Sequence, residues 1–227
     1  MNTINTYLDA AILKPETTRQ EAAAAIAECL KHRTMSVCVR PCDIELAKSM
    51  CQGTDTLVCC VLNFPHGNDT PDAKRAEAET YVRMGAAEID MVANFALARS
   101  GEWKLYEKDI RAVSTMTREA GLVLKVIFET CYLTVDEIRR CTEAAMNAEA
   151  DFVKTSTGFG TGGATEEAVK AMLDAAQGRI KVKPSGGIRD FARAKSFIDM
   201  GCQRLGVNFS SVAAICAGGK APGTDAY

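Results

Sequence analysis

Two lysines and one aspartate are the residues of this chain best placed for chemistry. Lys154, Lys183 and Asp90 each interrupt a short apolar segment, where a charge is unexpected. A lysine amine is nucleophilic only when it is deprotonated, and a second ammonium nearby favours the neutral form. Such an amine can form a Schiff base with a carbonyl substrate while a carboxylate moves the protons. The residue types therefore indicate amine-based carbonyl chemistry, with the choice of nucleophilic lysine left open.

Alternation along a strand predicts where these charges point. Side chains of a strand face opposite sides in turn, so in the segment 124–129 the apolar residues share one face and Lys125 and Glu129 share the other. By the same rule Lys154 and Lys183 face away from the valines that precede them. The charged face is expected to line the interior of a closed sheet. The expected interior set is Lys125, Lys154, Lys183, Asp90, Glu129 and Glu88.

Buried charges must pair or change their protonation state, since an isolated one costs several kcal/mol. A structural ion-pair network is therefore one interpretation of this set. The position of the lysines favours a catalytic role over a structural one. They lie near strand ends, and the active sites of barrel enzymes are built at the carboxyl ends of the strands.

The elements that would hold these residues alternate along the chain. Helical patterns, among them 18–32, the stretch after Thr70-Pro71, 134–147 and 165–177, separate short apolar segments. These segments lie near 7–13, 36–39, 57–62, 88–93, 122–128, 151–155, 180–184 and 203–208. Eight strands alternating with helices favour an α/β fold, a single (β/α)8 TIM barrel over residues 1–227. An open doubly wound sheet is the alternative, but no G-x-G-x-x-G follows the first segment.

Glycine-rich loops follow the sixth and seventh strands. Gly158 lies in the first, and Gly186, Gly187 and Arg189 lie in the second. Glycines let backbone N–H groups approach an anion, and barrels often hold phosphate after strands 7 and 8. Asn208, after the eighth strand, is a weaker candidate for the same pocket. The alternative is that these glycines only satisfy turn geometry.

Composition excludes several classes of protein. The 27 Lys+Arg and 29 Asp+Glu of the 227 residues give a formal charge of −2, which does not fit a nucleic-acid-binding protein. No apolar run suits a membrane span or a signal peptide, so we expect a cytoplasmic protein. The ten cysteines lack paired C-x2-C spacing, so we expect them to pack in the core and predict no metal site.

Longer motifs carry a resemblance. Taken in order, the segments are similar to those of the deoxyribose-phosphate aldolases, a family of Schiff-base (class I) aldolases on a TIM barrel. The most specific are Asp151-Phe-Val-Lys-Thr-Ser-Thr-Gly-Phe159 and Val182-Lys-Pro-Ser-Gly-Gly-Ile-Arg189, supported by Leu8–Pro15, Ser36–Pro41, Asn63–Gly67, Gly85–Val92 and Leu124–Thr130.

The resemblance implies a reaction and roles. The substrate would be 2-deoxy-D-ribose 5-phosphate, cleaved reversibly to acetaldehyde and D-glyceraldehyde 3-phosphate without a metal or organic cofactor. Lys154 would form the Schiff base, Lys183 would favour its neutral amine, and Asp90 would relay protons through water. Gly186, Gly187 and Arg189 would hold the phosphate. The resemblance also implies that the C-terminal residue Tyr227 reaches the active site. The alternative is that the chain end is disordered and has no such role. The partner is thus a small phosphorylated sugar, and a homodimer is left open.

Departures from the family pattern fall near the expected pocket and bear on substrate identity. They are Ala10, Ala11, Asn63, His66 and Asn208. Two alternatives remain: a Schiff-base aldolase for a different phosphorylated sugar, and a non-catalytic sugar-phosphate sensor.

Overall fold

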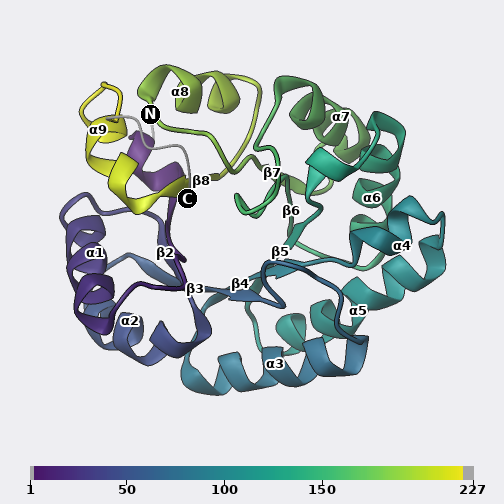
Figure 1. The fold of residues 1–227 in the computed structure, drawn as a ribbon, viewed down its shortest axis with the longest axis horizontal. Helices are drawn as coiled ribbons and strands as arrows, with labels where there is room; N and C mark the ends of the chain where they lie inside the picture. Colours follow the sequence, from purple (N-terminus) through teal and green to yellow (C-terminus); the bar gives the residue numbers. More distant parts are fainter. Residues whose placement is uncertain (1–2, 222–227) are drawn as a thin grey trace.

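The computed structural model describes residues 3–221, whose strands form an eight-stranded parallel sheet in the order β7-β6-β5-β4-β3-β2-β1-β8. Figure 1 shows these strands as a ring surrounded by helices. The strands are β1 Leu8–Ile12, β2 Ser36–Val39, β3 Leu57–Leu62, β4 Glu88–Val92, β5 Val123–Ile127, β6 Phe152–Lys154, β7 Lys181–Lys183 and β8 Leu205–Asn208. The predicted eight segments and the TIM barrel are confirmed.

Two backbone contacts close the sheet between β7 and β8. The Gly206 N–H donates to the Pro184 carbonyl at 2.9 Å, and the Gln203 N–H donates to the Val182 carbonyl at 3.2 Å. Ser185 and Gly206 form a parallel bridge, and a Cβ on Gly206 would collide with the Ser185 side chain. Glycine at 206 therefore permits the close approach that closes the barrel.

The helices begin and end where local chemistry favours it. They are α1 Arg19–Lys31, α2 Ile44–Cys51, α3 Pro71–Met84, α4 Phe95–Arg99, α5 Trp103–Glu119, α6 Val135–Asn147, α7 Glu166–Ala176, α8 Phe191–Asp199 and α9 Val212–Cys216. Thr18 and Thr134 begin α1 and α6 with capping boxes. Gly85 ends α3 in a left-handed conformation, and Gln177 ends α7 in the same conformation.

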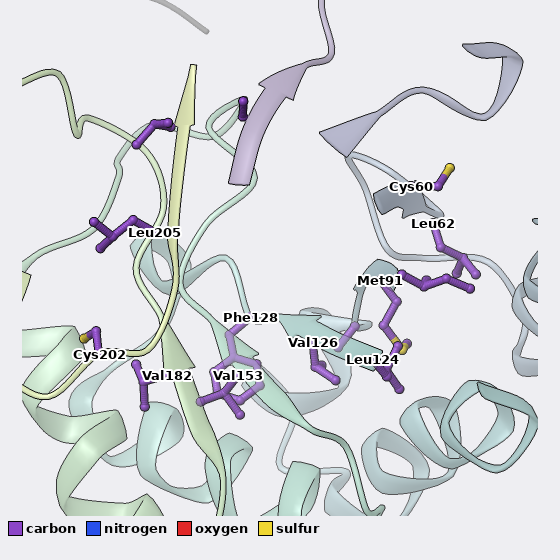
Figure 2. Close-up of a cluster of buried hydrophobic side chains, with 14 of the residues drawn as sticks. Cys60, Leu62, Met91, Leu124, Val126, Phe128, Val153, Val182, Cys202 and Leu205 are labelled. Atoms are coloured by element: carbon purple, nitrogen blue, oxygen red, sulfur yellow. The ribbon is translucent and has the colours of Figure 1, made fainter. Parts of the chain in front are cut away.

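The outer face of the strands carries the main hydrophobic core. Leu124, Val126 and Phe128, with Val153 and Val182 on the next strands, are fully buried in a cluster between strands and helices (Figure 2). This confirms the predicted helix-facing side of β5–β7. The opposite face of those strands consequently points into the barrel, where the charges lie.

A second, smaller apolar cluster lines the interior on the side of β1–β3. Its buried members are Ala11, Leu13, Cys38, Cys59 and Val61. None of the described helices has an apolar stretch long enough to cross a bilayer.

Candidate active site

Asp90 lies at the centre of the interior charges. Its Oδ2 accepts from the Lys154 Nζ at 2.8 Å and from the Lys183 Nζ at 2.7 Å. Lys154 and Lys183 are register partners on β6 and β7, so their side chains leave neighbouring strands at the same level. The structure thus brings together the three residues that the sequence singles out.

A second tier of charge surrounds Lys125. Its Nζ donates to Asp90 Oδ1 at 3.0 Å and to Glu88 Oε2 at 2.6 Å. Arg204 donates to both Glu88 and Asp9, while Asp9 Oδ2 lies 2.6 Å from the Lys183 Nζ. The expected inward orientation of Lys125 and Glu88 is confirmed. Asp9 and Arg204 were not predicted, although each is a charge within or next to an apolar segment, the signal used for the others.

Attraction outweighs burial in this cluster. Burial alone would raise the pKa of Asp90, but Lys125, Lys154 and Lys183 hold it well below its ordinary value. Burial alone would lower the pKa of Lys183, but Asp9 and Asp90 raise it above its ordinary value. Lys183 therefore stays an ammonium at neutral pH.

The three lysines differ in how firmly their charge is held. Lys125 lies within ion-pair distance of three carboxylates and Lys183 of two, whereas Lys154 is paired with Asp90. Lys154 also retains the largest exposure, 3%, at the carboxyl end of its strand. Three carboxylates face four cations in the cluster, so positive charge is in excess by one.

Glu129 secures the loop after β6. It has a left-handed backbone just beyond β5, and its carboxylate accepts from the Thr157 backbone N–H at 3.2 Å and from the Thr157 hydroxyl. Burial raises the pKa of Glu129. The side chain thus links the ends of β5 and β6 rather than joining the Asp90 cluster.

The glycine loops after β6 and β7 lie against each other. The Ala164 N–H donates to the Gly186 carbonyl at 3.1 Å, and a Cβ on Gly163 would lie 2.5 Å from that oxygen. Gly158, Gly186 and Gly187 all have positive φ, at 87°, 85° and 77°. These conformations favour glycine, so loop geometry is one reason for glycine at these three positions.

The other predicted binding residues are placed differently. The Asn208 side chain accepts from the Ser210 backbone N–H at 3.0 Å and its hydroxyl at 2.9 Å, which starts the short helical turn after β8. Arg189 lies at the end of the β7 loop, where its carbonyl accepts from the Ala221 N–H at 2.9 Å. Tyr227 lies outside the described residues.

A cavity of about 320 Å³ opens beside this site. It is lined by Pro65, His66, Phe95, Arg99, Glu129, Tyr132, Thr157, Phe159 and Gly160. Glu129 and Thr157 connect its wall to the loop that follows Lys154. His66 is therefore placed near the site, as expected.

The remaining departures fall in two environments. Ala11 joins the interior cluster, but Ala10 packs in the outer core toward the helices, so its expected role in the pocket is wrong. Asn63 holds its own loop, where its Oδ1 accepts from the Asp69 N–H at 3.1 Å and its backbone N–H donates to Glu77. Only one of the two alanines can therefore affect a ligand in the barrel.

The cysteines are not all core filler. Cys60 and Cys202 lie in the outer core as predicted (Figure 2), but Cys38 and Cys59 point inward. The Cys59 Sγ donates to Asp90 Oδ1 at 3.2 Å, and the Cys38 Sγ lies 4.0 Å from Asp90 Oδ2. Burial raises the pKa of Cys59, whereas a hydrogen bond with Cys59 lowers that of Cys38.

Known proteins resemble this chain over most of its length. The family model described as DeoC/LacD family aldolase matches residues 4–201. The chain belongs to this aldolase family. It is 44% identical over 215 residues to a deoxyribose-phosphate aldolase of Exiguobacterium sp., covering 94% of this chain and 96% of that protein.

Two further comparisons extend over the same length. A deoxyribose-phosphate aldolase of Streptococcus gordonii is 42% identical over 220 residues, covering 97% of this chain and 98% of that protein. The solved structure of QR15, an aldolase, superposes with a TM-score of 0.89 at 38% identity and covers 96% of both chains. The two relatives and the solved aldolase structure therefore each match this chain over nearly its whole length.

Proposed function

We propose that this chain is a class I aldolase, one domain over residues 1–227, that reversibly cleaves 2-deoxy-D-ribose 5-phosphate to acetaldehyde and D-glyceraldehyde 3-phosphate. The names of its relatives supply the substrate. The chemistry is supported by one observation on this chain: Lys154 is the least neutralised lysine of a cluster in which cations outnumber carboxylates.

Lys154 is the nucleophile in this proposal. Its neutral amine adds to the aldehyde carbon of the open-chain sugar, and loss of water gives an iminium. The bond between C2 and C3 then breaks, its electron pair moves into the enamine, and the C3 hydroxyl proton leaves to a base. Protonation of the enamine and hydrolysis release acetaldehyde and restore Lys154.

Lys183 and Asp90 set the protonation of that amine. An ammonium at Lys183 lies on the same Asp90 oxygen as Lys154, so repulsion favours loss of the Lys154 proton. Asp90, ionised and in contact with both lysines, orients them and relays protons through water. Because Asp9 and Asp90 keep Lys183 charged, Lys183 is the poorer nucleophile.

The substrate phosphate is proposed to bind at the loops after β6–β8. Gly158, Gly186, Gly187, Arg189 and Asn208 are the candidate residues, supported by the left-handed loop glycines and by the contact of the two loops. Turnover of 2-deoxyribose 5-phosphate compared with ribose and fructose phosphates tests the substrate. Faster turnover of ribose phosphate or fructose phosphate would mean that 2-deoxyribose 5-phosphate is not the preferred substrate.

Borohydride trapping tests the mechanism. Reduction in the presence of acetaldehyde should leave a stable adduct on Lys154, identified by peptide mapping. An adduct on another lysine, or none on a folded protein, would overturn the assignment.

Assembly and compartment belong to the proposal as well. All ten cysteines are unbridged, which supports a reducing compartment, the cytoplasm. A homodimer stays a prediction, which light scattering on the purified protein measures directly.

A further inference from the structure

Two cysteines and an aspartate, residue types that can bind a metal, lie together inside the barrel. The Sγ atoms of Cys38 and Cys59 and a carboxylate oxygen of Asp90 all lie within 4.8 Å of one another, and all three residues are buried. Cys38 and Cys59 are register partners on β2 and β3, which holds both side chains at one level. Asp90 faces them from β4, with one oxygen toward each thiol.

These spacings suit a thiophilic cation. Tetrahedral zinc binds sulfur at about 2.3 Å and oxygen at about 2.0–2.2 Å, which separates the donor atoms by roughly 3.3–3.8 Å. The Cys59 Sγ lies 3.2 Å and the Cys38 Sγ 4.0 Å from the nearest Asp90 oxygen. Small side-chain movements therefore complete a two-sulfur, one-oxygen site with a fourth position for water.

The charge balance of the pocket permits the binding. A divalent cation that displaces the two thiol protons leaves the net charge of the cluster unchanged, because two protons leave as two positive charges enter. The Lys125 ammonium lies 3.5 Å from the Cys59 Sγ and offsets part of the cost that burial places on a thiolate there. Spacing along the chain did not reveal this set, because its members come from three different strands.

We propose that Cys38, Cys59 and Asp90 bind Zn²⁺ or a similar thiophilic divalent cation, and that binding inhibits the enzyme. A cation on Asp90 withdraws this carboxylate from Lys154 and Lys183, which share its Oδ2. The inhibition rests on the proposed function, whereas the binding does not.

Cadmium is the probe for binding, because thiolate-to-cadmium charge transfer absorbs in the ultraviolet. Titration of the reduced, metal-free protein with Cd²⁺ should give this band with release of two protons per metal bound. At the Cd²⁺ concentration that saturates wild type, the Cys38→Ala and Cys59→Ala variants should each lack the charge-transfer band. Cys60→Ala is the matched control, since Cys60 adjoins Cys59 in sequence but lies in the outer core.

Zinc tests the inhibition. Zn²⁺ should inhibit wild type and Cys60→Ala to the same extent. It should inhibit Cys38→Ala and Cys59→Ala at least about tenfold more weakly, with each rate compared with that of the same protein without metal. Thermal melting without metal checks folding, and serine variants replace any alanine variant that does not fold. Metal sensitivity unchanged by both substitutions, or a cadmium band without inhibition by zinc, would overturn the proposal. Failure of borohydride trapping would instead refute the aldolase mechanism, and the cadmium band would remain a separate readout.

Discussion

Two buried ionic clusters in this protein are built in different ways. One is the Asp90 cluster inside the barrel. The other is the pair of Lys74 on α3 and Asp109 on α5, which lies outside the sheet, with the Nζ 2.7 Å from Asp109 Oδ2. Lys74 and Lys125 are both fully buried, so burial alone does not separate the clusters.

Backbone contacts distinguish the helix-layer pair. The Lys74 Nζ also donates to the Gly67 carbonyl at 2.8 Å and the Val92 carbonyl at 3.0 Å, so all three of its protons have acceptors. Asp109 accepts from the Asn94 N–H at 2.9 Å. The pair therefore ties the chain beyond β3 and β4 to the helices, which is a structural role. Asp90, in contrast, bonds to side chains: three lysines and Cys59.

The balance between burial and attraction also differs. Burial lowers the pKa of Lys74 and raises that of Asp109 against the attraction between them. In the barrel, attraction among several charges overcomes burial and keeps Asp90 and Lys183 ionised. A balanced pair fixed by the backbone thus indicates structure, and an unbalanced network of side chains indicates chemistry.

Removing the nucleophile should give the largest effect. Lys154→Met should lower turnover by about 10⁴-fold or more, since no other amine replaces it, while leaving the fold intact. Steady-state cleavage of 2-deoxyribose 5-phosphate measures the turnover, and thermal melting shows whether the variant is folded. Substantial residual activity would show that Lys154 has a structural role, as Lys74 has, and the two clusters would then not differ in function.

Removing the neighbouring ammonium should give the next largest effect. In Lys183→Leu, the Lys154 amine loses the repulsion that favours its neutral form, so turnover should fall by about 100-fold and the pH optimum should move upward. The pH–rate profile of the variant against wild type decides this. A lower rate with an unmoved profile would assign Lys183 a purely structural role.

Breaking the helix-layer pair should affect stability instead of chemistry. Lys74→Met leaves Asp109 buried and unpaired, so unfolding free energy should fall by about 3–5 kcal/mol, measured by denaturant titration. Arg75→Met is the matched control on the same helix, because its exposed pair with Glu79 contributes only about 0.3–0.5 kcal/mol. Borohydride trapping per folded molecule should be unaffected in both variants, and its loss in Lys74→Met would contradict a structural role.

Acid should separate the clusters with the smallest effect. The folded pKa of Asp90 lies below its unfolded value, so its contribution to stability is present above about pH 4 and is lost as pH falls toward the folded pKa. Asp109 has a raised pKa and the opposite sign, because protonation removes the cost of its buried charge. Between about pH 5 and about pH 3, wild type should lose about 1 kcal/mol more than Asp90→Asn, measured by denaturant titration. Equal losses would show that Asp90 is not held ionised by its lysines.

Much of the architecture could be predicted without coordinates. Period-2 alternation placed Leu124, Val126 and Phe128 toward the helices and Lys125 into the barrel, and the helical patterns at 18–32 and 134–147 located α1 and α6. Asp9 and Arg204 could not be assigned in this way. They are 195 positions apart, and only closure of the barrel brings Arg204 into contact with Asp9 and Glu88.

Sequence by itself determined that Lys125, Lys154 and Lys183 face the interior, because strand alternation is local and these charges stand out against apolar segments. Tertiary structure alone decided how these charges are shared. Lys154 and Lys183 meet on one oxygen of Asp90, and Cys38 and Cys59 face the same carboxylate, because parallel register places residues from separate strands at one level. Pairing depends on distances across the barrel, which no local pattern contains.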